Sequence, residues 1–121
     1  VTGNQAQDDG GGIYNESMMV MIDSTIDGNS TGNHGGGVRN ENQATITDST
    51  ISANSSGNNG GGLHDKGSAG TGATLTNVTI SGNTARFGKT KGPGHPQLHS
   101  SGLEQGHPGP FCFCDRVGAF V

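Results

Sequence analysis

The sequence predicts an all-β fold: a right-handed parallel β-helix of about three and a half coils, with 25 residues per coil, followed by an irregular tail. Three observations predict this solenoid. Glycine triplets recur at a fixed interval, apolar residues recur in the same phase, and asparagines recur at equivalent positions of each unit. A fixed period of about 20–50 residues is typical of repeat architectures.

The glycine triplets mark the period, because they begin at residues 10, 35 and 60. Glycine permits positive φ and close approach of backbones, so we expect the triplets where the chain turns a corner. A phosphate-binding loop is disfavoured, since no lysine follows at the required spacing and no helix is predicted to begin there. The predicted corner glycines are Gly10, Gly11, Gly12, Gly35, Gly36, Gly37, Gly60, Gly61 and Gly62.

Short alternating segments rich in β-branched residues predict three strands per coil, around 12–15, 19–23 and 25–28 in the first complete unit. Successive coils of a parallel β-helix stack ~4.8 Å apart. Aligned apolar side chains would therefore fill a narrow interior. The three apolar registers are Val1, Ile26, Ile51 and Ile80; Met21, Ile46 and Leu75; and Ile13, Val38 and Leu63.

Amide and carboxylate side chains also repeat with the coil. Stacked asparagines hydrogen-bond along a ladder, and they tolerate the left-handed backbone of sharp corners. We therefore expect these residues to be structural. The registers are Asn4, Asn29, Asn54 and Asn83; Asp23, Asp48 and Asn77; and Asn15, Asn40 and Asp65.

The period is interrupted once and then stops. Four extra residues in the third unit fall within 66–72, where we expect a tolerated corner loop. Residues 1–4 match 26–29, so we expect residues 1–85 to be a solenoid fragment that begins in mid-repeat. The triplet due at 89–91 is replaced by Lys-Thr-Lys, and residues 86–121 are predicted to be irregular or disordered. A frameshifted coding segment is the other explanation of this tail.

Composition limits the function classes. The chain has 121 residues and a net charge of −4, and no basic cluster interleaves with aromatics, which disfavours a nucleic-acid partner. No apolar run approaches membrane-spanning length. Cys112 and Cys114 both lie in the tail, so the repeats have no disulfide framework.

The sequence gives little support for a metal site. Calcium binding of the β-roll type is rejected, because the glycine and aspartate spacing differs and the period is 25 residues. We expect no cofactor and no metal ligand. The tail's possible zinc set matches no structural zinc pattern; it comprises His95, His99, His107, Cys112 and Cys114.

Candidate catalytic residues are few. His34 and His64 occupy different positions relative to their triplets, so we expect two separate solvent-facing residues rather than a stacked pair. Asp23 and Asp48 are predicted neighbours whose like charges would raise the pKa of one carboxyl. Because such aspartates repeat with the coil, we assign them to the scaffold and expect no catalytic residue. Sequons begin at Asn15, Asn29, Asn54 and Asn77 and would matter only in a eukaryotic secretory context.

Two phrases resemble the repeats of bacterial polymorphic outer-membrane proteins: Gly-Gly-Gly-Ile-Tyr-Asn at 10–15 and Asn-Val-Thr-Ile-Ser-Gly-Asn-Thr-Ala at 77–85. The resemblance covers residues 1–85. It implies a right-handed β-helix in a secreted or cell-surface protein, with adhesive or passenger-domain roles and no catalytic residue to transfer.

We therefore predict a non-enzymatic structural or adhesive segment of a bacterial surface protein. Surface glycans or components of host or neighbouring cells are the candidate partners. The alternative is a fragment of a polysaccharide lyase-like enzyme whose active site lies outside this chain.

Overall fold

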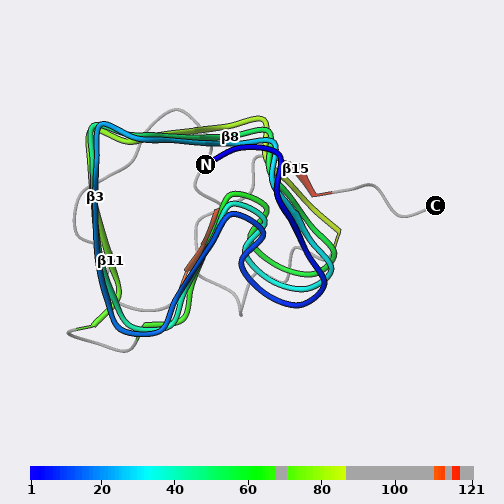
Figure 1. The fold of residues 1–121 in the computed structure, drawn as a ribbon, viewed down its shortest axis with the longest axis horizontal. Coiled ribbons are helices and arrows are strands. Elements are labelled where there is room, and N and C mark those ends of the chain that lie inside the picture. The colour runs from blue at the N-terminus through cyan, green and yellow to red at the C-terminus, as the bar shows by residue number, and fades with distance from the viewer. Residues whose placement is uncertain (68–70, 87–110, 114–115, 118–121) are drawn as a thin grey trace.

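The computed structural model describes residues 1–67, 71–86, 111–113 and 116–117. Every regular element within these ranges is a β-strand, and four sheets run along the molecule. Figure 1 looks along the solenoid from the N-terminal coil, and the chain runs clockwise as it recedes, which is a right-handed path. The predicted right-handed parallel β-helix is confirmed.

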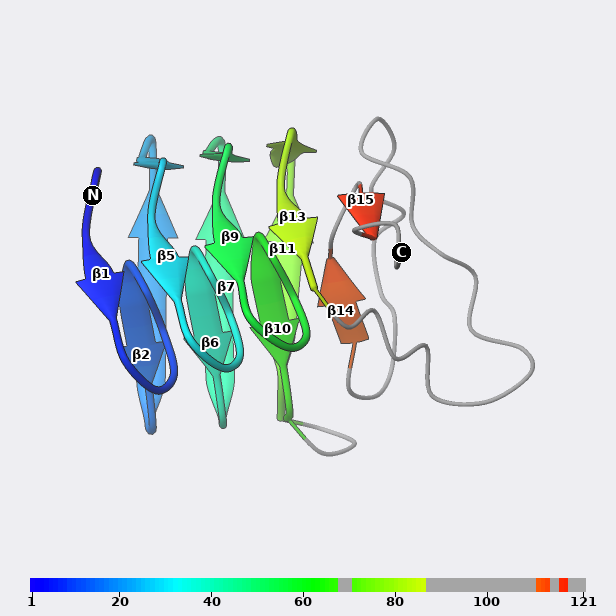
Figure 2. The ribbon, with the colours of Figure 1, turned by 90° about the vertical axis from the view of Figure 1, so that its right-hand side faces the viewer.

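The first complete coil contains β2 (Ile13–Asn15), β3 (Met18–Ile22), β4 (Thr25–Asp27) and β5 (Ser30–Thr31). The sequence predicted three of these strands and missed β5, because two Ser/Thr residues before a glycine form too short a pattern to detect. Figure 2 shows the coils stacked side by side. The remaining repeat strands are β1 (Gln5–Ala6), β6 (Val38–Asn40), β7 (Gln43–Thr47), β8 (Thr50–Ser52), β9 (Ser55–Ser56), β10 (Leu63–Asp65), β11 (Ala73–Thr76), β12 (Thr79–Ser81) and β13 (Thr84–Ala85).

Strand pairing between these coils is parallel and in register with the repeat. Ile26 pairs with Ile51, and Ile51 pairs with Ile80 across the insertion. Met21, Ile46 and Leu75 align in the β3–β7–β11 sheet in the same way. Because each apolar side chain meets its own equivalent one coil away, the interior is a set of aliphatic stacks. Its fully buried large apolar members are Ile26, Val38, Ile46, Ile51 and Leu63.

An asparagine ladder runs beside the aliphatic stacks, at the end of β4 and its equivalents. Asn54 Oδ1 accepts the backbone N–H of Asn29 (2.9 Å) and its side-chain amide (3.0 Å). Asn83 Oδ1 does the same for Asn54 at 2.9 Å each. The free amide hydrogen of Asn54 reaches the carbonyl of Ile26 (3.0 Å). Each buried asparagine therefore satisfies backbone groups that the corner would otherwise leave without partners.

A second ladder follows β2, β6 and β10. Asn15 Nδ2 donates to Asn40 Oδ1 (2.6 Å), and Asn40 Nδ2 donates to Asp65 Oδ1 (2.7 Å). Asp65 is buried and also accepts the backbone N–H groups of Gly67 (3.2 Å) and Ala73 (3.0 Å). The carboxylate can accept from both sides of the inserted loop. An aspartate at this position therefore closes the ladder where the extra residues leave the coil.

The third polar register supplies the corner after β3. Asp23, Asp48 and Asn77 all adopt left-handed φ, at 48°, 49° and 51°. The left-handed conformation costs less free energy for residues with short polar side chains than for most other non-glycine residues. The coil therefore uses asparagine and aspartate in two ways, as left-handed corners here and as buried hydrogen-bonding ladders at the other two positions.

The second and third glycines of each triplet lie against the adjacent coil with no room for a side chain. The first glycine has positive φ, at 67°, 70° and 66° in successive coils. A Cβ on the second, at Gly36, would lie 2.3 Å from the Gly61 carbonyl oxygen and 2.4 Å from that of Ser55. Both neighbours are backbone atoms that cannot move aside. The triplet therefore lets the backbones of adjacent coils pack closely, in addition to allowing the turn.

Two strands of the tail lie beyond the third coil (Figure 2). β14 (Phe111–Phe113) pairs antiparallel with β10, and β15 (Arg116–Val117) pairs parallel with β13. Residues 87–110, 114–115 and 118–121 lie outside the described residues; they include the replaced triplet at 89–91 and the histidines of the possible zinc set. The frameshift explanation stays a hypothesis.

We predict that Gly36→Ala destabilises the full chain by about 3 kcal/mol or more, because the added methyl overlaps backbone oxygens on two sides. The matched control is Gly28→Ala, since a Cβ there meets nothing within 4 Å and Ala53 occupies the equivalent corner of the next coil at φ 51°. Only the left-handed strain remains, about 1–2 kcal/mol. Urea unfolding followed by circular dichroism compares them, and equal losses would refute the steric explanation.

We predict that Asn54→Ala costs about 1–3 kcal/mol for each buried group that it leaves without a partner, which includes the Ile26 carbonyl. Asn4→Ala is the control at the exposed end of the same ladder and should lose much less. The urea midpoints of the two variants test the ladder. An Asn54→Ala midpoint as high as that of Asn4→Ala would contradict it.

Candidate binding face

The outward side of the β2–β6–β10 sheet carries three different planar side chains in one register. Tyr14 pairs with Arg39, and Arg39 pairs with His64. The inward and ladder positions of these strands hold similar residues in every coil, whereas this outer register changes chemistry at each step. Departures from a repeat are where a function specific to this chain is expected, because repeating positions serve the scaffold.

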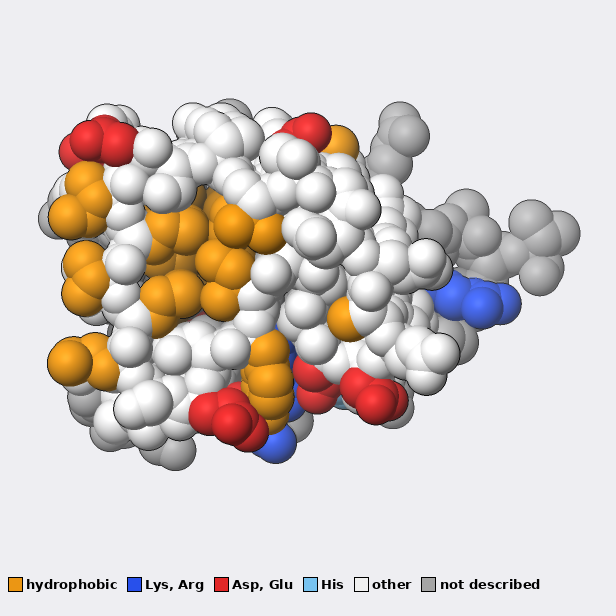
Figure 3. Space-filling view, viewed as in Figure 1, with side chains coloured by type: hydrophobic (Ala, Val, Ile, Leu, Met, Phe, Trp, Pro, Cys, Tyr) orange, Lys and Arg blue, Asp and Glu red, His pale blue; other side chains and the backbone are white. Residues whose placement is uncertain are grey.

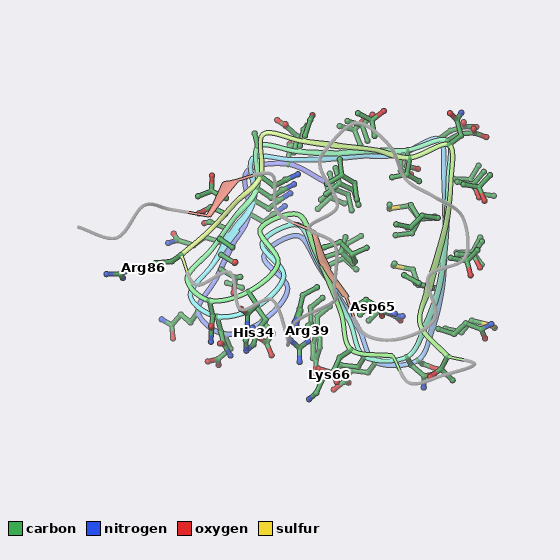
Figure 4. The ribbon with its side chains drawn as sticks, turned by 180° about the vertical axis from the view of Figure 1, so that it is seen from behind. His34, Arg39, Asp65, Lys66 and Arg86 are labelled. Atoms are coloured by element: carbon green, nitrogen blue, oxygen red, sulfur yellow. The ribbon has the colours of Figure 1, made fainter. Side chains whose placement is uncertain are left out.

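A fourth planar side chain reaches this register from a glycine loop. The glycine loops are residues 7–12, 32–37 and 57–62, which connect β1 to β2, β5 to β6 and β9 to β10. His34 comes from the second loop, and Figure 4 shows it beside Arg39, between the loop and β6. Its ring stacks on His64, with centroids 4.7 Å apart and planes at 27°.

The expectation that His34 and His64 do not meet was wrong. Their different positions relative to the triplets are the reason that they do meet. The residue before a triplet lies on one side of the tight glycine turn, and the residue four places after the first glycine lies on the other side. The turn folds position 34 back beside Arg39 of the same coil, and Arg39 pairs with His64 of the next coil. Sequence alignment of the repeats compares only equivalent positions and misses such a pair.

Arg39 anchors the cluster and is almost completely buried, at 4% exposure. Its Nε donates to Glu41 Oε1 (2.7 Å), its Nη2 contacts the same oxygen, and Lys66 Nζ lies 3.6 Å from Glu41 Oε2. Its Nη1 donates to His64 Nδ1. A buried guanidinium requires such pairing, because an uncompensated buried charge is strongly destabilising.

The contact with Arg39 defines which nitrogen of His64 carries the proton. Arginine has no acceptor, so His64 Nδ1 must be unprotonated and its proton lies on Nε2. Burial, and then the charge of Arg39, lowers the pKa of His64 to about 3. The same two causes lower the pKa of His34, whose Nδ1 accepts the Asn59 backbone N–H (3.4 Å). Both rings are therefore neutral at neutral pH.

The adjoining acidic groups hold the loop in place. Asp9 Oδ1 accepts the backbone N–H of His34 (2.9 Å), which ties the second glycine loop to the first.

Tyr14 is 47% exposed, and desolvation followed by the carboxylates of Glu41 and Glu16 raises the pKa of its hydroxyl. The phenol therefore stays protonated and can donate.

A separate feature lies on the outer side of β3. Met18, Val20 and Ile22 are exposed by 72%, 64% and 56%, and Figure 3 shows hydrophobic side chains along this edge. Thr45 and Thr47 replace Val20 and Ile22 in the next coil. The apolar strip is thus confined to the first coil.

The aspartates predicted to belong to the scaffold accept hydrogen bonds from neighbouring coils. Asp27 Oδ1 accepts the Ser52 hydroxyl (2.7 Å), and Asp48 Oδ1 accepts the Asn77 amide (2.5 Å). No group of three or more metal-ligating side chains occurs in the ranges that the structure describes. No helix in those ranges is long and apolar enough to cross a membrane.

Of the sequon asparagines, Asn77 is exposed, whereas the others are buried in the ladders: Asn15, Asn29 and Asn54.

The comparisons with known proteins agree with this architecture. Residues 1–16 match the model of the Chlamydia polymorphic membrane protein repeat. The resemblance noted from the glycine and asparagine phrases is confirmed over those residues. Comparisons with curated proteins and with solved structures give no match.

We predict that the chain loses stability as the pH falls from about 6.5 toward about 3, in part through His64. Its folded pKa is lowered to about 3, so the unfolded chain binds this proton first and the stabilisation is complete only above the unfolded pKa. One extra proton gives a slope of at most about 1.4 kcal/mol per pH unit. Urea midpoints measured down the pH range should fall less steeply in His64→Gln than in the parent chain. Parallel curves would show that His64 does not contribute.

Proposed function

We propose that this chain is a non-enzymatic structural segment of a secreted or cell-surface bacterial β-solenoid, and that it presents its lateral faces for adhesion. The observation that carries the proposal is the use of the repeating polar side chains. They bond from coil to coil, as Asn29, Asn54 and Asn83 do, rather than converging on one point. The match to the polymorphic membrane protein repeat supports the surface location.

The aspartates of the described residues support the non-enzymatic part of the proposal. Polysaccharide cleavage by a lyase-like enzyme needs acids and bases that converge on one groove. Asp27, Asp48 and Asp65 instead lie in different registers, and each accepts hydrogen bonds from a neighbouring coil. Their carboxylates therefore form hydrogen bonds that connect successive coils of the solenoid.

The test displays the full chain, or its Gly36→Ala variant, on a non-adherent bacterium. We expect the cells that display the full chain to bind other bacterial or epithelial cells more strongly, because Gly36→Ala disrupts the coil stacking. The purified chain should leave acidic polysaccharides intact. Adhesion counts and the ultraviolet absorbance of unsaturated cleavage products measure the two properties. Equal adhesion by both displayed chains would contradict the adhesive role, and unsaturated products would contradict the non-enzymatic part of the proposal.

A further inference from the structure

The planar face, comprising Tyr14, His34, Arg39 and His64, has the features of a preorganised binding site. Arg39 is held by Glu41 and donates to His64, whose ring is stacked on His34. The His34 backbone is tied to Asp9. Such contacts restrict the side-chain rotamers before any ligand arrives, which lowers the entropic cost of binding.

The electrostatics of the face favour an uncharged ligand. The charges of Arg39 and Lys66 are both paired with Glu41, and both imidazoles are neutral at neutral pH because their pKa values are lowered. An anionic ligand would have to approach the carboxylates of Glu41 and Asp9 as well. Nucleic acid is disfavoured for the same reason, since its affinity depends on neutralising phosphates with free cations.

The exposed groups combine flat apolar surfaces with hydrogen-bonding edges. Tyr14 offers a half-exposed ring and a protonated hydroxyl, and His34 and His64 are half-buried rings, of which His64 carries its proton on Nε2. Sugars have matching properties, because their C–H faces pack on rings while their hydroxyls both donate and accept. The coil spacing of ~4.8 Å places these groups in steps along the solenoid axis, which suits a linear ligand.

We propose that the planar face binds a neutral glycan chain that lies along the solenoid axis, with its sugar rings packed on Tyr14 and His34. Arg39 acts as a positioning residue that holds His64 in the donor tautomer. This inference rests on the proposed adhesive function and names its ligand class and its site.

The test uses the full chain on an array of neutral and acidic oligosaccharides, followed by calorimetric titration with the neutral oligosaccharide that binds best. Tyr14→Ala and His34→Ala should each weaken binding by about tenfold or more, which corresponds to about 1.4 kcal/mol. Tyr14→Phe keeps the ring and should retain most of the affinity. Val20→Thr, on the outer side of β3, is the matched surface control and should bind like the parent chain. Circular dichroism verifies that each variant keeps the parent fold.

The outcomes separate this inference from the proposed function. If displayed cells adhere but Tyr14→Ala and His34→Ala bind the glycan like the parent, the assigned face is wrong and the adhesive role stands. Binding to acidic oligosaccharides alone, or adhesion that survives enzymatic removal of the target cell's glycans, would overturn the ligand class. If the chain binds neither glycans nor cells, both proposals fail together.

Discussion

The structure depends on satisfying the same buried backbone groups in every coil. Asn29, Asn54 and Asn83 are buried, and the backbone carbonyl and N–H groups that they contact are shielded from water. The asparagine ladder meets this requirement, because one side chain accepts from the coil before it and donates to a backbone carbonyl in that coil. The amide of Asn54 has two N–H donors, one for the Ile26 carbonyl and one for Asn83 Oδ1, whereas a hydroxyl has one donor and an ionised carboxylate has none. The ladder therefore reinforces the register that the parallel strand pairing sets.

The glycine triplets are the steric counterpart of the ladder. Gly37 lies against the Asn54 side chain, and Gly36 lies against the backbone of the next coil. A side chain at either position would push the coils apart and lengthen the amide hydrogen bonds. The ladder and the triplets are therefore coupled, and each keeps the other within bonding distance. This coupling explains why both features recur with the same period.

The scaffold leaves only its outer registers free to vary. On the β2–β6–β10 sheet they hold Tyr14, Arg39 and His64, and on β3 they hold an apolar strip that the next coil replaces with threonine. The variable residues rest on strands whose positions are fixed by the ladders, so their side chains are presented at regular steps. Such a surface is suited to extended ligands more than to a closed catalytic pocket.

The sequence by itself determined the period, the parallel stacking, the alignment of Ile26 with Ile51 and the alignment of Asn29 with Asn54, because these contacts join equivalent residues of successive units. It could not predict β5, whose two residues carry no periodic signal, or the way in which Asp65 closes the insertion. The pairing of His34 with His64 was also decided only by the tertiary structure. It joins positions that are not equivalent in the repeat, and it exists because the glycine turn folds the loop back over β6, whose neighbour in the sheet is β10. The physical reason is the same throughout: translation along the solenoid preserves contacts between like residues, whereas contacts across a turn depend on a backbone path that repetition does not reveal.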